Sequence, residues 1–347
     1  MGGRKQRRVI RGVGLLVSLA SLWLVLHSVD VGASVKLLTG ANPLPIVACL
    51  AVVATQLTLR SVRWRLLLPS PPGGGSIRLR RIAPALLVGY LGNAVLPARL
   101  GEPIRAYLVA RREKLDPAEA FGSVVLERIV DTATLAVVAF AAAVAVNAPG
   151  WIVQTTALAA LASVALTAVL IVVGLGPLVR LGRRLLSHLP GAGQTAPILG
   201  RLDVFARGID RPSRSWAVVM AVVISGACWM LDATTFWLAA GAIGVSMSPA
   251  AALLVAAVTV LGTALPSAPG YVGTFELAAA ATAGALGVAA APALALAVLA
   301  HAMTVLPLAA GGAISLAAMD MGLGRLADEA SEAPVADRRL EPAVTPP

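Results

Sequence analysis

Long apolar stretches alternate with short basic stretches along most of the chain. The apolar stretches cover residues 12–29, 43–59, 118–147, 151–175, 216–240 and 292–318. A helix needs about 20 apolar residues to cross the hydrocarbon core of a bilayer, and these stretches are close to that length or longer. They lack the two-residue alternation of the strands of a membrane barrel. The pattern therefore predicts an all-α polytopic integral membrane protein with about six spanning helices.

Two further apolar segments are interrupted by glycine and proline. The first, residues 82–96, is short and is followed by Pro97, Gly101 and Glu102, and the chain is basic on both sides of it. If this segment crossed the membrane, positive loops would lie on both faces. A re-entrant hairpin removes that conflict, because non-helical backbone is tolerated at membrane depth where protein or water covers it. A plain spanning helix with a polar kink remains the alternative.

The second interrupted segment follows the apolar residues 250–265. Pro266, Pro269, Gly270 and Gly273 lie there, just before Glu276. The structural interpretation of this segment is a tight loop, and the functional interpretation is a gate or a ligand-facing turn. Each half of the chain then has two spans, a broken segment and a third span. Because three is odd, the two halves would sit in opposite orientations, as in transporters built from inverted repeats.

Composition and charge fit this arrangement. The chain is 58% hydrophobic and only 13% charged, whereas soluble domains carry about 25% charged residues. The net charge of +11 comes from basic clusters between apolar stretches, which is the positive-inside pattern rather than a nucleic-acid surface. We expect anionic headgroups at these cytoplasmic loops and cytoplasmic N- and C-termini.

The same pattern divides the chain into regions. We expect a basic cytoplasmic N-terminus at 1–11, a membrane domain at 12–318 and a disordered tail at 319–347. The membrane domain has a first half at about 12–147 and a second half at about 151–318, with a basic interfacial segment at 177–215. Cys49 and Cys228 lie within apolar stretches, so they predict neither a disulfide framework nor a metal site. We expect no cofactor.

Charged residues inside apolar stretches are the candidate functional groups, because they are expensive in lipid. Glu127, Arg128 and Asp131 lie in the stretch 118–147. Helical spacing lets Arg128 pair with Asp131 and leaves Glu127 to meet Arg99 or Arg105. One interpretation is an ion-pair network that locks helices together. The other is that Arg99, Arg105 and Arg128 bind an anionic headgroup, since the planar guanidinium bonds two phosphate oxygens at once.

The second half offers fewer candidates. Glu276 either caps a helix N-terminus or binds a substrate amine, and Asp232 is either satisfied by packing or functional. His301 is expected to pack between helices. The candidate headgroup or cavity residues are Asn93, Arg99, Glu102, Arg105, Glu127, Arg128, Asp131, Asp232 and Glu276. The candidate hairpin or gate residues are Pro97, Gly101, Pro266, Pro269, Gly270 and Gly273.

Together, the two broken motifs resemble a known family. Asn93, Leu96-Pro97, Gly101-Glu102 and Arg105, then Glu127-Arg128 and Asp131, and later Leu265 to Glu276, are similar to the flippase-like membrane domain of the lysylphosphatidylglycerol synthases. The resemblance covers about residues 10–318 and lacks the soluble aminoacyl-transferase domain of the full synthases. It implies a bacterial inner-membrane protein that moves lipid between leaflets, with cavity residues Arg99, Glu102, Arg105, Glu127, Arg128 and Glu276. His301 stands about where the family often has arginine.

The leading hypothesis is a protein that binds and translocates a polar or charged lipid, a phospholipid or a glycolipid, without nucleotide hydrolysis. No nucleophile with its base, and no nucleotide-binding motif, is visible in the sequence, so an enzyme is not expected. The alternatives are a secondary transporter of a small water-soluble solute and a non-transporting accessory subunit. A homo-oligomer is compatible with each of them.

Overall fold

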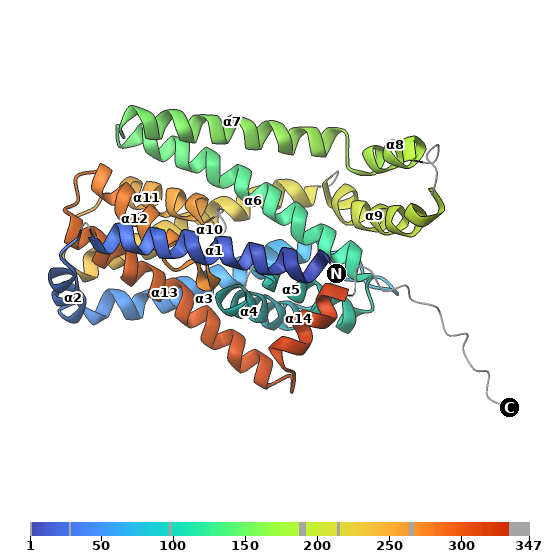
Figure 1. The fold of residues 1–347 in the computed structure, drawn as a ribbon, viewed down its shortest axis with the longest axis horizontal. Helices are drawn as coiled ribbons and strands as arrows, with labels where there is room; N and C mark the ends of the chain where they lie inside the picture. Colours follow the sequence, from blue (N-terminus) through green and yellow to red (C-terminus); the bar gives the residue numbers. More distant parts are fainter. Residues whose placement is uncertain are drawn as a thin grey trace.

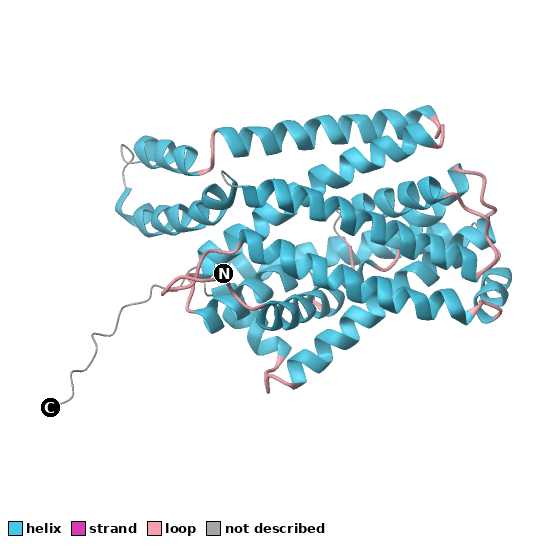
Figure 2. Ribbon diagram, turned by 180° about the vertical axis from the view of Figure 1, so that it is seen from behind, coloured by secondary structure: helices cyan, strands magenta, loops and turns pink. Residues whose placement is uncertain are grey.

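The computed structural model describes residues 2–332 except 28, 97–98, 187–191, 214–215 and 264–266. Every regular element in this part of the chain is a helix, and no strand occurs among these residues (Figure 2). The predicted all-α polytopic fold is therefore confirmed. Pro97 and Pro266, two of the predicted hairpin residues, lie outside the described residues.

Five described helices are long and apolar enough to cross a membrane. They are α3 (Pro43–Leu67), α6 (Pro117–Ala145), α7 (Gly150–Val172), α10 (Trp216–Ala242) and α13 (Ala290–Ala317). A sixth crossing would combine α1 (Gly2–His27) with α2 (Val31–Thr39), which meet at a bend of 89°. The second span is longer than the predicted 43–59, because the helix continues through its arginines to Leu67.

Three of the membrane helices begin with the same local signal. Asn42, Asp116 and Ser248 each stand before a proline, and each side chain accepts a hydrogen bond from a free amide of the first helical turn. Proline suits the first helical position because its missing N–H would have no partner there. These caps fix where α3, α6 and α11 (Pro249–Gly262) start.

The two interrupted segments form helical hairpins. The first consists of α4 (Leu79–Val95) and α5 (Gly101–Glu113), and the second of α11, the short 3₁₀ turn η2 (Pro269–Tyr271) and α12 (Thr274–Ala285). In the first hairpin Arg81 at the start of α4 bonds Glu113 at the end of α5, at 2.9 Å. Both arms therefore return to the same end of the bundle.

The two hairpins enter the bundle from opposite ends. At one end the Asn42 amide before α3 donates to the carbonyl of Ala242 at the end of α10. At that end Ser34 also donates to the carbonyl of Ala291, which lies at the start of α13. The α11–α12 hairpin connects α10 to α13 and so opens there, whereas the α4–α5 hairpin opens at the other end, between α3 and α6 (Figure 1).

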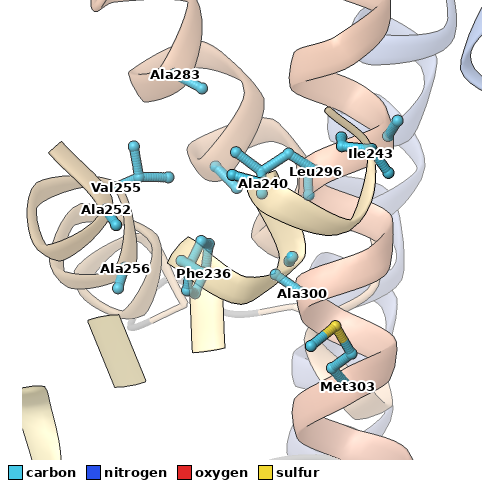
Figure 3. Close-up of a cluster of buried hydrophobic side chains, with 14 of the residues drawn as sticks. Phe236, Ala240, Ile243, Ala252, Val255, Ala256, Ala283, Leu296, Ala300 and Met303 are labelled. Carbon is cyan, nitrogen blue, oxygen red and sulfur yellow. The ribbon is translucent and has the colours of Figure 1, made fainter. Parts of the chain in front are cut away.

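The packing follows the inverted repeat that this arrangement requires. The third-span helices of the two halves each pack against the first arm of the opposite hairpin, α13 on α4 and α6 on α11. The corresponding helices α3 and α10 pack against each other. Figure 3 shows the largest apolar cluster, where Phe236 of α10 and Val255 of α11 lie near Leu296 and Met303 of α13. Small alanines such as Ala240 and Ala300 let these helices approach closely.

Two helices, α8 (Gly176–Leu186) and α9 (Ala192–Ser213), fill the predicted basic segment at the end where the first hairpin opens. The backbone amides of Leu175 and Gly176 donate to the carboxylate of Asp210 on α9 and so anchor the start of α8. That α8 lies along a membrane interface stays a prediction.

The predicted disorder from residue 319 is wrong for part of the tail. Residues Leu323–Glu332 form α14, which packs on α5 (Figure 1). Leu326 is fully buried in this contact, and Glu329 meets Tyr107 and Arg111. One buried apolar face is enough to hold this helix against α5. The average composition of the tail is polar, so composition alone did not reveal that face.

Candidate functional site

Arg63 lies at the centre of a charged network inside the bundle. Its side chain on α3 is 1% exposed and bonds Glu127 at 2.7 Å. The same guanidinium also bonds Asp131 and the hydroxyl of Ser225 on α10. From sequence, Arg60, Arg63 and Arg65 mark the cytoplasmic end of the second span, 43–59. The structure corrects this, because α3 continues about two turns further, to Leu67, and places Arg63 inside the protein.

Glu127 joins three arginines to one carboxylate. Besides Arg63, Arg105 of α5 lies 2.9 Å away, and Arg128 lies 3.3 Å away. Arg105 also bonds Glu102 at 2.7 Å, and its guanidinium lies over the ring of Trp64, 4.7 Å from the ring centroid. Arg105 is therefore almost completely buried, between Glu102, Glu127 and Trp64.

Arg128 is held more loosely than the other arginines of the network. It lies 3.7 Å from Asp131 and 3.9 Å from Glu102, and 33% of its side chain is exposed. Its Nε has no hydrogen-bond partner in the described part of the chain. Arg128 therefore presents a positive charge on the accessible side of an otherwise buried cluster.

Asp232 extends the network toward α10. Arg60, one turn before Arg63 on α3, bonds Asp232 at 3.0 Å and the hydroxyl of Tyr90 on α4 at 3.0 Å. Asp232, which is isolated in the sequence, therefore has an ionic partner in the fold. Four arginines and four carboxylates now make up the network, so its formal charge is zero: Arg60, Arg63, Arg105, Arg128, Glu102, Glu127, Asp131 and Asp232.

Close glycine contacts build the tip of the first hairpin. A Cβ at Gly101 would overlap the carbonyl oxygen of Gly89, so only glycine lets α5 lie this close to α4. Asn93 closes the tip, because its side-chain oxygen accepts a hydrogen bond from the Gly101 amide at 3.0 Å. Asn93 thus holds the hairpin together from within it.

The tips of the two hairpins touch each other. Arg99, in the left-handed conformation at φ 54°, donates to the carbonyl of Thr263 at the end of α11 at 2.8 Å. Its guanidinium lies 5.4 Å from the ring centroid of Tyr271. Gly270 is also close, since a Cβ there would lie 3.3 Å from the carbonyl oxygen of Ala94. The two broken segments therefore meet inside the bundle.

Glu276 stands apart from the network. One of its oxygens accepts from the Gly273 amide at 2.7 Å, and the other lies 2.5 Å from Nδ1 of His301. The His301 ring also stacks on Phe275, with centroids 4.2 Å apart. This geometry caps α12 and ties it to α13, while Gly273 lies against the backbone of Ser18 on α1.

A buried ion pair gains little net stability, since desolvating the charges offsets their attraction. Within the described residues, no group of histidine, cysteine and acidic side chains is arranged to hold a metal ion. The network is partly accessible from outside the protein, because the side chains of Arg128, Glu102 and Arg60 are 33%, 18% and 15% exposed.

Comparison with known proteins identifies the family. The chain belongs to the lysylphosphatidylglycerol synthase TM region family, whose model matches residues 12–312. The glycosyltransferase AglD of Haloferax volcanii is 28% identical over 97% of this chain, and the chain spans 58% of its length. The UPF0104 membrane protein MJ1595 of Methanocaldococcus jannaschii is 22% identical over 76% of this chain and 81% of that protein. No solved structure matches.

The family match confirms the predicted membership and a multi-pass membrane protein. Both relatives are archaeal, so the predicted bacterial origin is not supported and stays a prediction.

Proposed function

We propose that this protein binds a polar or charged lipid and carries its headgroup between the two leaflets, with no nucleotide hydrolysis. One observation carries the proposal: a network of eight charged side chains lies inside the bundle, beside the meeting point of two hairpins that enter from opposite ends. In many transporters the substrate binds where discontinuous helices meet near the membrane midplane.

A headgroup crossing the bilayer needs polar partners to replace its water. The insertion cost of a single charge at the bilayer centre is about 2.5–3.5 kcal/mol even on the lenient scale. Arg128 can lower this cost, because its guanidinium is a third exposed and its ion pairs are longer than those of Arg63 and Arg105. A headgroup oxygen can replace a carboxylate oxygen at Arg128 while Arg63 stays bonded to Glu127 and Asp131, and Arg105 to Glu127.

The charge distribution suggests the orientation of the protein. The end where the first hairpin opens carries Arg78, Arg80, Arg111 and Arg112, and α9 adds further arginines there. By the positive-inside rule we place this end in the cytoplasm. α1 starts and α14 lies at this end (Figure 1), so we propose that both termini lie in the cytoplasm and that the protein is a cell-membrane protein.

One relative suggests a second role. The protein that is 28% identical is named a glycosyltransferase, and this chain spans 58% of its length. The second candidate is therefore an accessory membrane subunit that holds a lipid for a separate glycosyltransferase. We assign no chemical step to this chain in either role.

The test is a lipid translocation assay with the purified full chain in phosphatidylcholine vesicles. An acyl-chain fluorophore on a trace lipid is quenched by dithionite from outside, and the slow phase reports transfer from the inner leaflet. We expect transfer by the wild type and a loss of at least tenfold with Arg128→Ala. The matched control is Lys36→Gln, which removes an exposed charge from α2 and should leave the rate unchanged. Equal rates in wild-type and empty vesicles would favour the accessory role.

A further inference from the structure

Arg99 differs from every arginine of the charged network. Its partners are the Thr263 carbonyl and the face of the Tyr271 ring, and no carboxylate of the described residues lies within ion-pair distance of it. Its side chain is exposed. Arg99 is therefore a cation whose charge nothing nearby neutralises.

The depth of Arg99 in the bundle makes its uncompensated charge unusual. α4 has 17 residues, so at 1.5 Å per residue the hairpin tip lies about 25 Å from the basic end of the bundle. At the same rise, α13 with its 28 residues is about 42 Å long, and it packs on α4, so the tip lies well inside the length of the bundle. An uncompensated cation at this depth is a functional site by default and calls for an anion.

Arg99 and Arg128 lie on either side of Glu102. Glu102 follows Arg99 by three residues at the start of α5, and its carboxylate lies 3.9 Å from the Arg128 guanidinium. Arg128 is the loosely held arginine of the network, because a third of its side chain is exposed and its ion pairs are 3.3–3.9 Å long. Two partly exposed guanidinium groups therefore lie close to the first hairpin tip.

The charges of this region do not balance. The network of four arginines and four carboxylates is neutral, so Arg99 leaves one positive charge in excess. Glu276 makes no ion pair with Arg99, because its carboxylate lies against His301 and the Gly273 amide instead. A ligand with one negative charge would make the region neutral, and a cationic ligand would add repulsion.

We propose that the meeting point of the two hairpins is a binding site for the phosphate group of a ligand with a net charge of −1, held between Arg99 and Arg128. The inference rests on the proposed function in one respect, which is that the phosphate belongs to an anionic phospholipid. A planar guanidinium offers two parallel N–H bonds to phosphate oxygens, so two arginines can hold one phosphate diester. Arg99 gives up only neutral partners on binding, which favours the exchange.

The site should therefore reject the cationic headgroup that the name of the family suggests. A lysyl ester adds two ammonium groups to phosphatidylglycerol and changes its net charge from −1 to +1. Such a headgroup would face Arg99 with no free carboxylate beside it. We expect the order of affinity to be anionic, then zwitterionic, then cationic.

The test measures lipid binding to the purified full chain in detergent by native mass spectrometry. The probes are phosphatidylglycerol, phosphatidylcholine and lysylphosphatidylglycerol with identical acyl chains. We expect phosphatidylglycerol to bind about tenfold more tightly than phosphatidylcholine, which corresponds to about 1.4 kcal/mol. Arg99→Gln should abolish this preference and Arg99→Lys should keep most of it. Lys36→Gln, at the opposite end from the basic loops, should behave as the wild type.

Two further comparisons complete the experiment. One distinguishes a phospholipid from a soluble phosphate ester as the ligand, and the other distinguishes failure of the anion site from failure of the translocation proposal. If sn-glycerol 3-phosphate in solution competes as well as phosphatidylglycerol does, the anion site stands and its ligand is a soluble solute. If phosphatidylglycerol is preferred through Arg99 but no lipid is translocated, the site stands and the translocation proposal falls. If lipids are translocated with equal rates for all three headgroups, or the cationic lipid binds most tightly, the anion site is overturned.

Discussion

Replacing Arg63 by methionine tests whether the charged network holds the bundle together. Arg63 bonds Glu127, Asp131 and Ser225 and is almost completely inaccessible. Methionine keeps most of the volume of the side chain and removes only the charge and the donors. Glu127 would then keep Arg105 and Arg128, whereas Asp131 would keep only the contact with Arg128 at 3.7 Å.

The size of the effect depends on the charges left behind. Hydrogen bonds between helices of a membrane protein contribute about 0.6 kcal/mol on average, with a maximum near 1.7 kcal/mol. Removing one partner of a buried ion pair costs more, about 3–5 kcal/mol, because a charge stays buried without compensation. Without Arg63 the network lacks one positive charge and Asp131 keeps only a long contact with Arg128, so we expect a loss of about 3–4 kcal/mol in the free energy of unfolding.

The assay is reversible unfolding in mixed micelles, followed by circular dichroism as the fraction of denaturing detergent rises. Arg111→Met is the matched control, since Arg111 is 58% exposed and its pair with Glu329 is 3.4 Å long. Such surface pairs contribute about 0–1 kcal/mol. Adding Asp131→Asn to Arg63→Met should recover about 1 kcal/mol. A loss below 1 kcal/mol with Arg63→Met, equal to that of the control, would refute the reasoning.

Three further predictions test the hairpins and the orientation. Gly101→Ala should destabilise the protein by about 1–3 kcal/mol in the same unfolding assay, whereas Gly226→Ala, in open space on α10, should be neutral or slightly stabilising. Glu276→Ala should remove the cap of α12 and accelerate amide hydrogen exchange at the second hairpin tip; unchanged exchange there would contradict the cap. A cysteine at Ser70 should react with an impermeant reagent only from the cytoplasmic side and one at Lys36 only from the outside, and the reverse labelling would invert the proposed orientation.

The sequence was sufficient to predict most of the spanning helices and the two interrupted segments, because both depend on local composition, but it did not predict α14. Apolar length indicated the spanning helices, and the glycines and prolines around Gly101 and Gly270 marked the breaks. The need of a buried acid for a cation predicted Arg99 or Arg105 as a partner of Glu127, and the structure shows Arg105, while Arg99 bonds Thr263 instead. The length of α3 was missed, since a run of arginines after an apolar stretch normally marks the membrane boundary.

Arg63, the centre of the network, could not be found from sequence, because the run of arginines that contains it was interpreted as the membrane boundary. Arg60 and Arg63 looked like ordinary members of a cytoplasmic cluster, yet they neutralise Asp232, Glu127 and Asp131. One signal was present: several acids inside apolar stretches require as many buried cations. Which arginines supply them depends on how α3 packs against α6 and α10, and that information is not local.

The most direct test of lipid translocation is to ask whether a headgroup reaches the interior network. A phospholipid with a photoreactive diazirine on its headgroup can be incorporated into membranes that contain the full chain, then activated, and the adducts mapped by peptide mass spectrometry. The account predicts adducts in residues 99–107 and 127–131, reduced when an excess of unlabelled lipid competes. Adducts confined to the basic loops and α8–α9 would contradict it, because the headgroup would then remain at the membrane surface.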